Sequence, residues 1–417
     1  MPDGSSSEKQ IVAIVGGAVA GSEAAFDFAQ AGIHSVVIEQ NPLPYGKIED
    51  GLPIWHVKQR RKEMDLIDSR IGDTMVSYIP CTKFGEDILF NELYDLNWSA
   101  IILANGAWKD RPFPIPAIEQ YEWNGFYYQN PFVHWFNHYR EARYHGEDVP
   151  IVDSPLVVGG GLASIDVVKI LQLEEVAHAM KKRGTPVDII EMEHRGIPAT
   201  LAEHDLTWGD LGLDGCLFIY RRDVTNMPLV AMPPDVTPER EEKIHQTRQK
   251  ILKNAQKKYL FHFKDHTQPV DIIVENEKLV GLKVIKTKVI DGKAIPIKGS
   301  EHEIRSSLIV SSIGSIPEPI SDIPMNHRTY DIESKKTGHL EGLERVFSIG
   351  NALTGKGNIH VSRTSARDIT KHIIENELPP NGSVDVDLIQ NKVKQWQTKI
   401  GYDGNYLNWI KERHAQN

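Results

Sequence analysis

The sequence predicts an α/β fold, and three patterns carry this prediction. Short β-branched runs alternate along the chain with longer segments of helical spacing. Two of these runs, beginning at residues 10 and 154, lead directly into a glycine-rich turn and a helix-like segment. Other apolar runs end in small residues, as buried parallel strands often do. The 417 residues exceed what one small core needs, so the length favours two domains.

The elements are expected in the following order. A strand at 10–15, a turn at 16–21, a helix at 22–32 and a strand at 35–39 form a first βαβ unit. Residues 154–174 repeat the strand, the glycine turn and the helix. The sequence further predicts a buried strand at 99–107, a helix at 237–258, a β-meander within 271–312, buried strands at 306–314 and 344–353, and helices over 385–414.

Composition and charge narrow the class of protein. The formal net charge of −10 argues against nucleic acid as the main partner, because phosphate binding needs a basic face. The longest apolar runs are too short for a membrane span, and residues 1–10 resemble neither a signal peptide nor a transit peptide. Cys81 and Cys216 form no CxxC pair, which excludes a disulfide framework, a redox dithiol and a protein-held iron–sulfur cluster. We therefore expect a cytoplasmic protein.

The first glycine turn has the features of a dinucleotide site. A pyrophosphate needs a tight turn after a strand and a helix N-terminus for its charge. Gly16 is placed to make the turn and Gly21 to allow close helix–strand packing, while Ala18 stands where a third glycine is usual. Glu39 ends the next strand, where a carboxylate can accept hydrogen bonds from ribose hydroxyls. The alternative is a helix packed closely on a strand with no ligand.

The second glycine turn, GGGLAS at 159–164, matches the dinucleotide pattern in full. Two candidate strands follow it. One ends in Glu191 and Glu193, which would favour the free ribose of NAD. The other ends in Arg221 and Arg222, a pair suited to the 2′-phosphate of NADP and also compatible with a solvated strand end. Two dinucleotide units in one chain indicate FAD together with a nicotinamide cofactor.

The loop after the first βαβ unit carries a resemblance to a known family. Residues 41–58 read NPLPYGKIEDGLPIWHVK. The chain resembles the adrenodoxin reductase and ferredoxin–NADP reductase family, in which a P-x-P-Y/F-G loop, a second glycine, a histidine and a lysine follow that unit. The matching residues here are Pro42, Pro44, Tyr45, Gly46, Gly51, His56 and Lys58. The resemblance covers about residues 9–375, and a more distant one is to the small subunit of glutamate synthase.

This resemblance implies an α/β architecture of two Rossmann-like dinucleotide-binding domains, with the NADP-binding domain inserted in the FAD-binding domain. Residues 1–112 and 318–417 are then expected to bind FAD. Residues 113–317 are expected to bind NADP and to carry a helical insertion at about 175–214. In the family, the two arginines after the second-domain strand bind the 2′-phosphate, which favours Arg221 and Arg222, and therefore NADP.

The resemblance also implies the residues of the sites. His56 is expected to lie beside the flavin. His56 and Asp166 are expected to contact each other through water and to act in catalysis by tuning the flavin. The alternative is that His56 only orders its loop and Asp166 only complements a helix N-terminus. The residues expected to bind the two cofactors are Gly16, Ala18, Val19, Ala20, Gly21, Glu39, Gly46, Lys47, Thr82, Ala104, Gly106, Gly350, Asn351, Gly357, Asn358, Ile359, Gly159, Gly160, Gly161, Leu162, Ala163, Arg221 and Arg222.

The sequence departs from the family pattern at several of these positions. Ala18 replaces a glycine, Lys47 a leucine, Glu49 an arginine and Leu162 an asparagine. Asn351 stands where relatives have tryptophan or aspartate. These changes leave both sites intact but affect the expected flavin potential and nicotinamide placement. The cysteine-rich cluster domain of the glutamate synthase small subunit is absent, which puts that role in doubt.

The function implied is transfer of electrons from NADPH through FAD to a separate ferredoxin-like iron–sulfur protein. No nucleic acid partner and no membrane span are expected. Two alternatives remain open: a flavin-dependent monooxygenase, which shares both nucleotide folds, and a non-catalytic NADP-sensing flavoprotein. The cations that would face an acidic carrier, or simply be solvated, are Arg248, Lys250, Lys253, Lys257 and Lys258 on a predicted helix, and Lys58, Arg60, Arg61 and Lys62.

Overall fold

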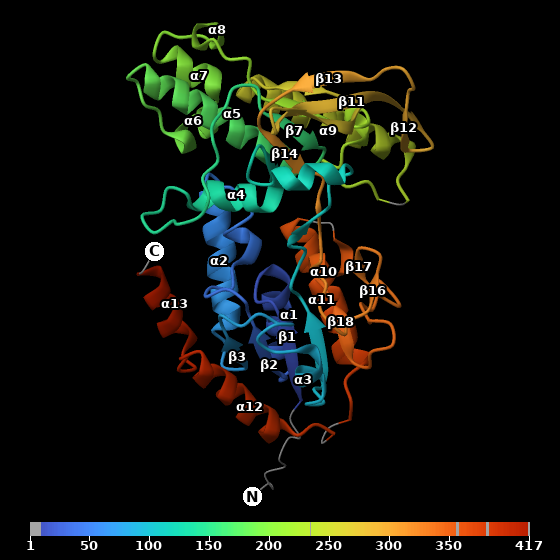
Figure 1. Ribbon diagram of the computed structural model, residues 1–417. Coiled ribbons are helices and arrows are strands. Elements are labelled where there is room, and N and C mark those ends of the chain that lie inside the picture. The colour runs from blue at the N-terminus through green and yellow to red at the C-terminus, as the bar shows by residue number, and fades with distance from the viewer. Residues whose placement is uncertain (1–9, 234, 356–357, 381–382, 416–417) are drawn as a thin grey trace, which may run out of the picture. The chain divides into compact units, whose positions relative to one another are not determined.

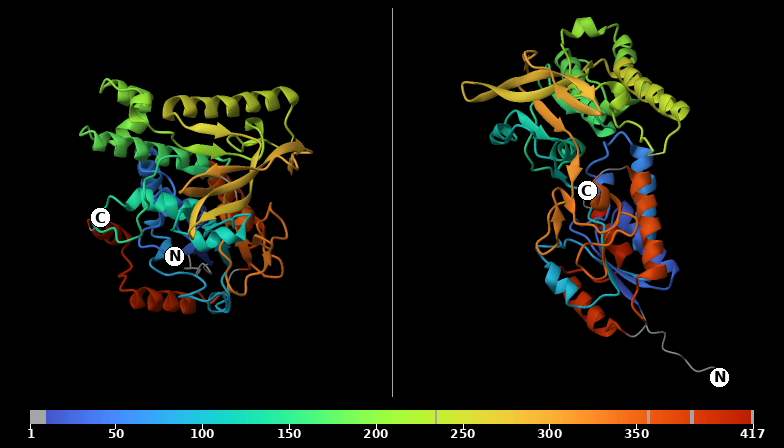
Figure 2. Two further views of the ribbon diagram at one scale, coloured as in Figure 1. Left: turned by 45° about the horizontal axis from the view of Figure 1, so that its top comes forward. Right: turned by 90° about the vertical axis from the view of Figure 1, so that its right-hand side faces the viewer.

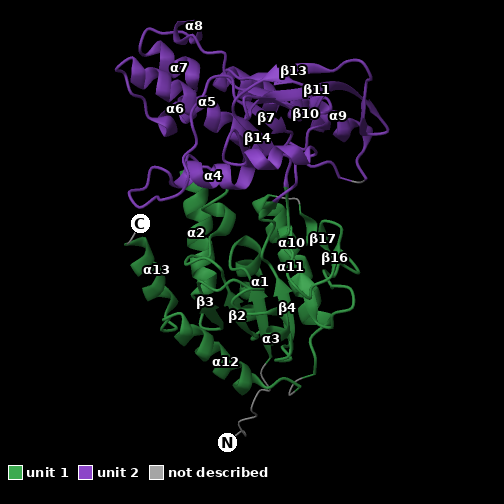
Figure 3. Ribbon diagram, in the orientation of Figure 1, with its two compact units in different colours: residues 1–52, 56–109, 315–417 green, residues 53–55, 110–314 purple. Residues whose placement is uncertain are grey.

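The computed structural model describes residues 10–233, 235–355, 358–380 and 383–415, which form two compact units (Figures 1 and 3). Unit 1 comprises residues 1–52, 56–109 and 315–417, and unit 2 comprises residues 53–55 and 110–314. The chain therefore leaves unit 1 at 109–110 and returns at 314–315, a few residues before the expected boundaries. Each unit contains its own parallel sheet, so the predicted α/β fold class is confirmed.

Unit 1 is built on a five-stranded parallel sheet in the order β18-β4-β1-β2-β3. The two central pairings bring Val15 at the end of β1 opposite Ile38 of β2 and Leu103 of β4. The carboxyl ends of these strands therefore meet at one edge, where the first glycine turn begins. The strands are β1 (Ile11–Val15), β2 (His34–Ile38), β3 (Val76–Ile79), β4 (Ala100–Leu103) and β18 (Val346–Ser348).

Helices pack around this sheet, and α1 packs against both α2 and α11. A buried ion cluster joins these three helices, because Glu23 of α1 pairs with Arg70 of α2 at 2.5 Å and with Arg367 of α11. The helices are η1 (Gly46–Ile48), α1 (Val19–Gln30), α2 (Val57–Ile71), α3 (Phe90–Tyr94), α10 (Gly350–Thr354), α11 (Ile359–Asn376), α12 (Val386–Lys399) and α13 (Tyr406–His414). A small hairpin pairs β16 (Met325–Asn326) with β17 (Thr329–Tyr330).

Unit 2 has a second five-stranded parallel sheet, in the order β6-β14-β7-β8-β9. Its strands are β6 (Phe126–Tyr128), β7 (Leu156–Gly159), β8 (Leu217–Ile219), β9 (His262–Lys264) and β14 (Ile309–Ser312). The strand beside β7 is thus the one that precedes Arg221. The competing segment around residues 186–193 is helical instead, because Asp188 caps the start of α6 by accepting from the Glu191 N–H.

The helices of unit 2 are η2 (Pro116–Tyr121), α4 (Gln129–His138), α5 (Leu162–Lys182), α6 (Ile189–Arg195), α7 (Ile197–Ala202), α8 (Trp208–Leu211), η3 (Val224–Asn226) and α9 (Pro238–Tyr259). The predicted meander is present as the antiparallel strands β10 (Thr267–Glu275), β11 (Lys278–Ile290), β12 (Lys293–Pro296) and β13 (His302–Arg305). Figure 2 shows its long strands, in yellow and orange, projecting from the unit.

The two places where the chain passes between the units lie side by side. β5 (Lys109–Asp110) contains the first passage and β15 (Ser315–Ile316) directly follows the second. The two strands pair as a two-stranded sheet. Within unit 2, the Arg111 N–H donates to the Gly314 carbonyl oxygen at 2.9 Å. The first and last residues of the long stretch 110–314 are therefore neighbours.

Candidate cofactor-binding sites

The turn between β1 and α1 has a shape that only small residues allow. Gly16 has φ +96°, and its N–H donates to the Ile38 carbonyl at 2.8 Å. A Cβ atom on Gly16 would lie 2.7 Å from the Ala104 carbonyl oxygen, and one on Gly21 would overlap the carbonyl oxygen of Gly16. No described side chain caps α1. Its N-terminal N–H groups therefore suit an anion such as a pyrophosphate.

Glu39 lies beside this turn, directly after β2. Its carboxylate accepts from the Gly17 N–H at 2.9 Å and from the Asn41 N–H at 3.0 Å, and the side chain is buried. Burial raises the pKa of Glu39 to about 7, although these backbone hydrogen bonds lower it. The carboxylate is thus held in one position next to the start of α1.

Three further expected residues converge on the start of α1. A Cβ atom on Gly46 would be 3.0 Å from the Ala18 Cβ, and one on Gly350 would be 2.7 Å from the Ala20 Cβ. Asn351 follows Gly350, and its side-chain oxygen is buried and accepts from no described residue. A buried amide oxygen without a donor is costly, so this position fits contact with a bound group.

The other expected residues of unit 1 lie on neighbouring segments. Lys47 donates to the Ser315 hydroxyl at 3.3 Å and lies 5.4 Å from the centre of the Trp108 ring. Buried Thr82 donates its N–H to the Glu39 carbonyl at 2.8 Å. Ala104 follows β4 directly, and its N–H donates to the Val15 carbonyl at 2.8 Å.

Residues around Gly106 and the start of α11 complete the predicted set in unit 1. Val19 is the first residue of α1, and Gly106 has φ +71°. Asn358 caps α11 by accepting from the Val361 N–H at 3.0 Å, and Ile359 is the first residue of that helix. Gly357 lies outside the described residues.

The second glycine turn joins β7 to α5. Ser164 Oγ accepts from the N–H groups of Gly160 and Gly161, at 3.0 and 3.2 Å, and donates to the Ser312 carbonyl at 2.9 Å. Gly159 ends β7, and Leu162 and Ala163 are the exposed first residues of α5. The Ser164 side chain therefore shapes this turn and accepts hydrogen bonds from two of the backbone N–H groups of the turn.

The two arginines after β8 differ in their environment: Arg222 is held by hydrogen bonds and Arg221 is exposed. Arg222 donates to the Tyr220 hydroxyl at 2.8 Å, to the Asn226 carbonyl at 3.3 Å and to the Gly292 carbonyl at 3.1 Å. Arg221 is exposed, and its guanidinium bonds to no other described residue. Since β8 lies next to β7, the pair stands where a dinucleotide-binding unit holds its ribose partner.

The two predicted catalytic residues lie in different segments, and the contact between them stays a prediction. His56 precedes α2 as its N-terminal flanking residue. Asp166, in the first turns of α5, pairs with Lys169 at 3.2 Å. The Lys169 ammonium also lies 4.4 Å from the centre of the Trp55 ring, and Trp55 directly precedes His56 in the chain. Both partners of this contact belong to unit 2.

Lys169 is a functional candidate that the sequence reasoning missed. It is buried and forms a second ion pair with Glu193 of α6 at 2.9 Å. Burial opposes ionisation of Glu193, but hydrogen bonds from Lys169 and Tyr259 lower its pKa overall. Glu193 therefore stabilises unit 2 and does not lie at the end of a strand. The one feature of the sequence that could have identified Lys169 was a lysine within an apolar helical stretch.

The expected cationic surfaces are partly confirmed. Lys250, Lys253 and Lys257 of α9 are exposed. Arg248 was expected on the same face, and this is wrong: it is buried and donates to the carbonyls of Thr225 and Val230. Lys58, Arg61 and Lys62 are likewise exposed, whereas Arg60 donates to the carbonyls of Glu49 and Leu52.

The chain is similar in sequence and in fold to known proteins. Residues 10–206 match the family model described as pyridine nucleotide-disulphide oxidoreductase. The chain is 25% identical over 368 residues to the mitochondrial NADPH:adrenodoxin oxidoreductase of Arabidopsis thaliana, covering 79% of this chain and 73% of that protein. It is 29% identical over 167 residues to the glutamate synthase [NADPH] small chain of Mycobacterium tuberculosis, covering 38% of this chain and 32% of that one.

Among solved structures, FprA of Mycobacterium tuberculosis in complex with NADPH matches with a TM-score of 0.70 at 19% identity. The match covers 94% of this chain and 91% of that one, and it shows a shared fold. The resemblance to adrenodoxin reductases and the distant one to glutamate synthase are thus confirmed, as is the oxidoreductase class.

Among the described residues, no helix is long and apolar enough to span a membrane, and Cys81 and Cys216 are both free.

Proposed function

From this relationship to the adrenodoxin reductases, we propose that the protein takes electrons from NADPH through FAD and passes them to a ferredoxin-like one-electron carrier. One observation carries the proposal: a single chain holds two dinucleotide turns, the first beside a buried carboxylate and the second beside an arginine pair. The carboxylate suits a ribose with free hydroxyls and the arginines a ribose with a 2′-phosphate. The comparisons support FAD and NADP as the cofactors.

The residues of unit 1 fit FAD. The start of α1 would receive the pyrophosphate, with Gly16 and Gly21 leaving the backbone accessible. Glu39 would accept hydrogen bonds from the adenosine ribose, and Asn351 has a buried oxygen able to accept one more. FMN has no adenosine ribose, so Glu39 favours FAD over FMN.

The residues of unit 2 fit NADP. Arg221 has a guanidinium free of other described partners, and Arg222 is oriented by Tyr220, Asn226 and Gly292. Two guanidinium groups at the end of β8 would bind a 2′-phosphate by charge-assisted hydrogen bonds. The start of α5 would receive the pyrophosphate, with Gly161 as its flanking residue.

The protein's part in the reaction is placement and electrostatics. Bound FAD would supply the chemistry, which is to take up a hydride from NADPH and to release electrons one at a time. His56 and Asp166 are proposed to provide a polar path for the accompanying proton, and Lys169 holds the Asp166 carboxylate in place. Two separate cysteines cannot ligate an iron–sulfur cluster. We therefore propose that single electrons are transferred to another protein, and that this takes place in the cytoplasm.

The proposal is tested by the colour and redox chemistry of the purified protein. It should be yellow, release FAD on denaturation, bleach when NADPH is added without oxygen, and recover its colour on addition of an oxidised ferredoxin. A colourless protein that cannot be reconstituted with FAD would contradict the proposal. Oxygen uptake that depends on an organic substrate would instead support the monooxygenase alternative. A bound flavin that NADPH leaves unreduced would support the sensing alternative.

A further inference from the structure

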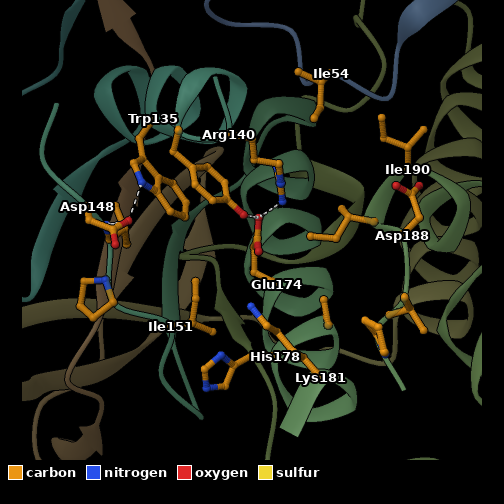
Figure 4. Close-up of a pocket in the computed structure, with 17 residues that line it drawn as sticks. Ile54, Trp135, Arg140, Asp148, Ile151, Glu174, His178, Lys181, Asp188 and Ile190 are labelled. Atoms are coloured by element: carbon orange, nitrogen blue, oxygen red, sulfur yellow. Dashed lines mark hydrogen bonds and ion pairs between the residues drawn. The ribbon is translucent and has the colours of Figure 1, made fainter. Parts of the chain in front are cut away.

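Unit 2 contains a cavity of roughly 600 Å³ that neither dinucleotide turn uses (Figure 4). Its walls come from α4 and the residues after it, from the segment 148–151, from the second half of α5 and from residues 186–190. The last of these belong to the helical insertion, which the proposed function leaves without a role. The volume falls within the usual range for small-molecule sites.

Most of the cavity wall is apolar. Trp135, Tyr139, Ile151, Ile189 and Ile190 line it together with prolines and smaller residues. The Trp135 and Tyr139 rings stack on each other, with centres 4.6 Å apart and planes at 10°. The residues after α4 and those before α6 include Pro150 and Pro186, whose fixed backbone angle φ stiffens both walls. The cavity therefore suits a small apolar body.

The acidic side chains in the wall already have donors from the protein. Glu174 is buried and accepts from the Tyr139 hydroxyl at 2.7 Å and from Arg140. Asp148 accepts from the Trp135 indole N–H at 3.1 Å and from the Val149 N–H at 2.9 Å. Asp188 caps α6. Figure 4 shows the bonds to Glu174 and Asp148 as dashed lines.

Two of the three basic side chains in the wall have no such partners. Arg140 is committed to Glu174 and lies over the Tyr139 ring at 4.2 Å. Lys181 and His178 form no ion pair or hydrogen bond through their side chains with any described residue. In Figure 4 the Lys181 side chain extends toward the space between Ile151 and Glu174. Lys181 is therefore a cation at the cavity wall that no described carboxylate pairs with.

We propose that this cavity is a binding site for a small carboxylic acid with an apolar body, whose carboxylate pairs with Lys181 and His178. The apolar body would lie against the aromatic and isoleucine side chains. The Glu174–Arg140 pair would shape the wall without taking part in recognition, because both groups satisfy each other. This inference does not depend on the bound flavin or on the choice between NADPH and NADH.

The test compares 3-phenylpropionate with its neutral amide, 3-phenylpropanamide, by calorimetric titration of the full-length protein. The acid should bind at least about tenfold more tightly than the amide, since a charge-assisted contact contributes at least about that factor. Lys181→Met should remove most of the preference for the acid, with His178 as the remaining polar partner. Lys250→Met, on the exposed side of α9, is the matched control and should change neither affinity.

A second variant locates the site. Ala177 lines the cavity on α5, and Ala177→Trp should fill it and weaken binding of both probes. Equal affinity of the wild type for acid and amide would overturn the proposal, as would no measurable binding of either. Unchanged binding of the acid in Lys181→Met would also overturn it. If Ala177→Trp fails to fold, the Lys181→Met comparison still decides the outcome, because an exposed lysine at a helix end tolerates replacement.

Discussion

The Tyr220 hydroxyl accepts two hydrogen bonds from Arg222, one from Nε at 3.1 Å and one from Nη2 at 2.8 Å. The same hydroxyl donates to the Asn226 carbonyl at 2.9 Å. The Tyr220 ring also fills the space that a side chain on Gly160 would need, since a Cβ there would overlap it. One tyrosine therefore shapes the second glycine turn and orients an arginine proposed to bind the 2′-phosphate.

Tyr220→Phe should keep the ring against Gly160 and remove the group that orients Arg222. Arg222 would keep its contacts to Asn226 and Gly292, so the loss is partial. We expect KM for NADPH to rise by about 3- to 10-fold with kcat little changed, and KM for NADH to stay the same. Steady-state kinetics with both nucleotides measure this. Equal changes for NADPH and NADH would mean that Tyr220 acts only on the turn.

Replacing Arg221 and Arg222 together by alanine should weaken NADPH much more than NADH. Charge-assisted contacts to a phosphate contribute about 1.5–3 kcal/mol, so the affinity for NADPH should fall by about 10- to 100-fold. Nucleotide affinities from titration of the flavin absorbance give the comparison. A wild-type preference for NADH would show that the arginines do not bind a 2′-phosphate.

His56→Gln and Asp166→Asn should each retain FAD and slow flavin reduction by NADPH. Both changes keep the approximate size of the side chain and remove its ability to take up and give back a proton. Rapid-mixing absorbance at the flavin band measures the rate over a range of pH. Wild-type rates with an unchanged pH profile in both variants would leave the two residues a purely structural role.

Lys169→Met should destabilise unit 2 strongly, because Asp166 and Glu193 would lose their shared cation in a buried site. Breaking a buried ion pair by removing one partner costs about 3–5 kcal/mol. Lys181→Met on the same helix is the matched control and should change the free energy of unfolding by less than about 0.5 kcal/mol, because Lys181 is exposed. Urea unfolding of both variants separates the two outcomes. Equal effects would argue against the ion-pair cluster.

Glu175→Gln should make the stability of the protein less dependent on pH. Burial and the neighbouring Asp153 raise the pKa of Glu175 from 4.5 to about 9. Between these values the unfolded state loses its proton and the folded state keeps it, so Glu175 lowers stability as pH rises. Glutamine has no such proton. The variant should therefore gain on the order of 1–3 kcal/mol over wild type by pH 8, and nothing at pH 4, in urea unfolding. A parallel pH dependence in both proteins would contradict this.

The parts of the fold and site that depend on local sequence were predictable. Gly16, Gly21 and Glu39 lie within one βαβ unit, where the turn and the strand end follow from residue type and spacing. Lys169 and Tyr220 were not predictable, because their roles come from contacts with residues far away in the sequence. Lys169 contacts Glu193, Tyr259 and Trp55, and Tyr220 packs against Gly160.

Arg248 and the segment at 186–193 show two other limits. Arg248 is one of several cations on a polar helix, and only the loop at 225–230 that packs on it removes it from the surface. A short apolar run such as VDIIEME fits a strand or a helix equally well. The cap from Asp188 and the contacts of Glu193 select the helix.

The hydrogen bond from Arg111 to Gly314 has a consequence for how such a protein can be assembled or rebuilt. Because the two ends of the 110–314 stretch are adjacent, this stretch can be removed as a cassette and the gap closed by a linker of very few residues. A homologous cassette with a different nucleotide preference could take its place without moving either cut end. With this connectivity, the proposed choice of hydride donor would be exchanged together with the cassette.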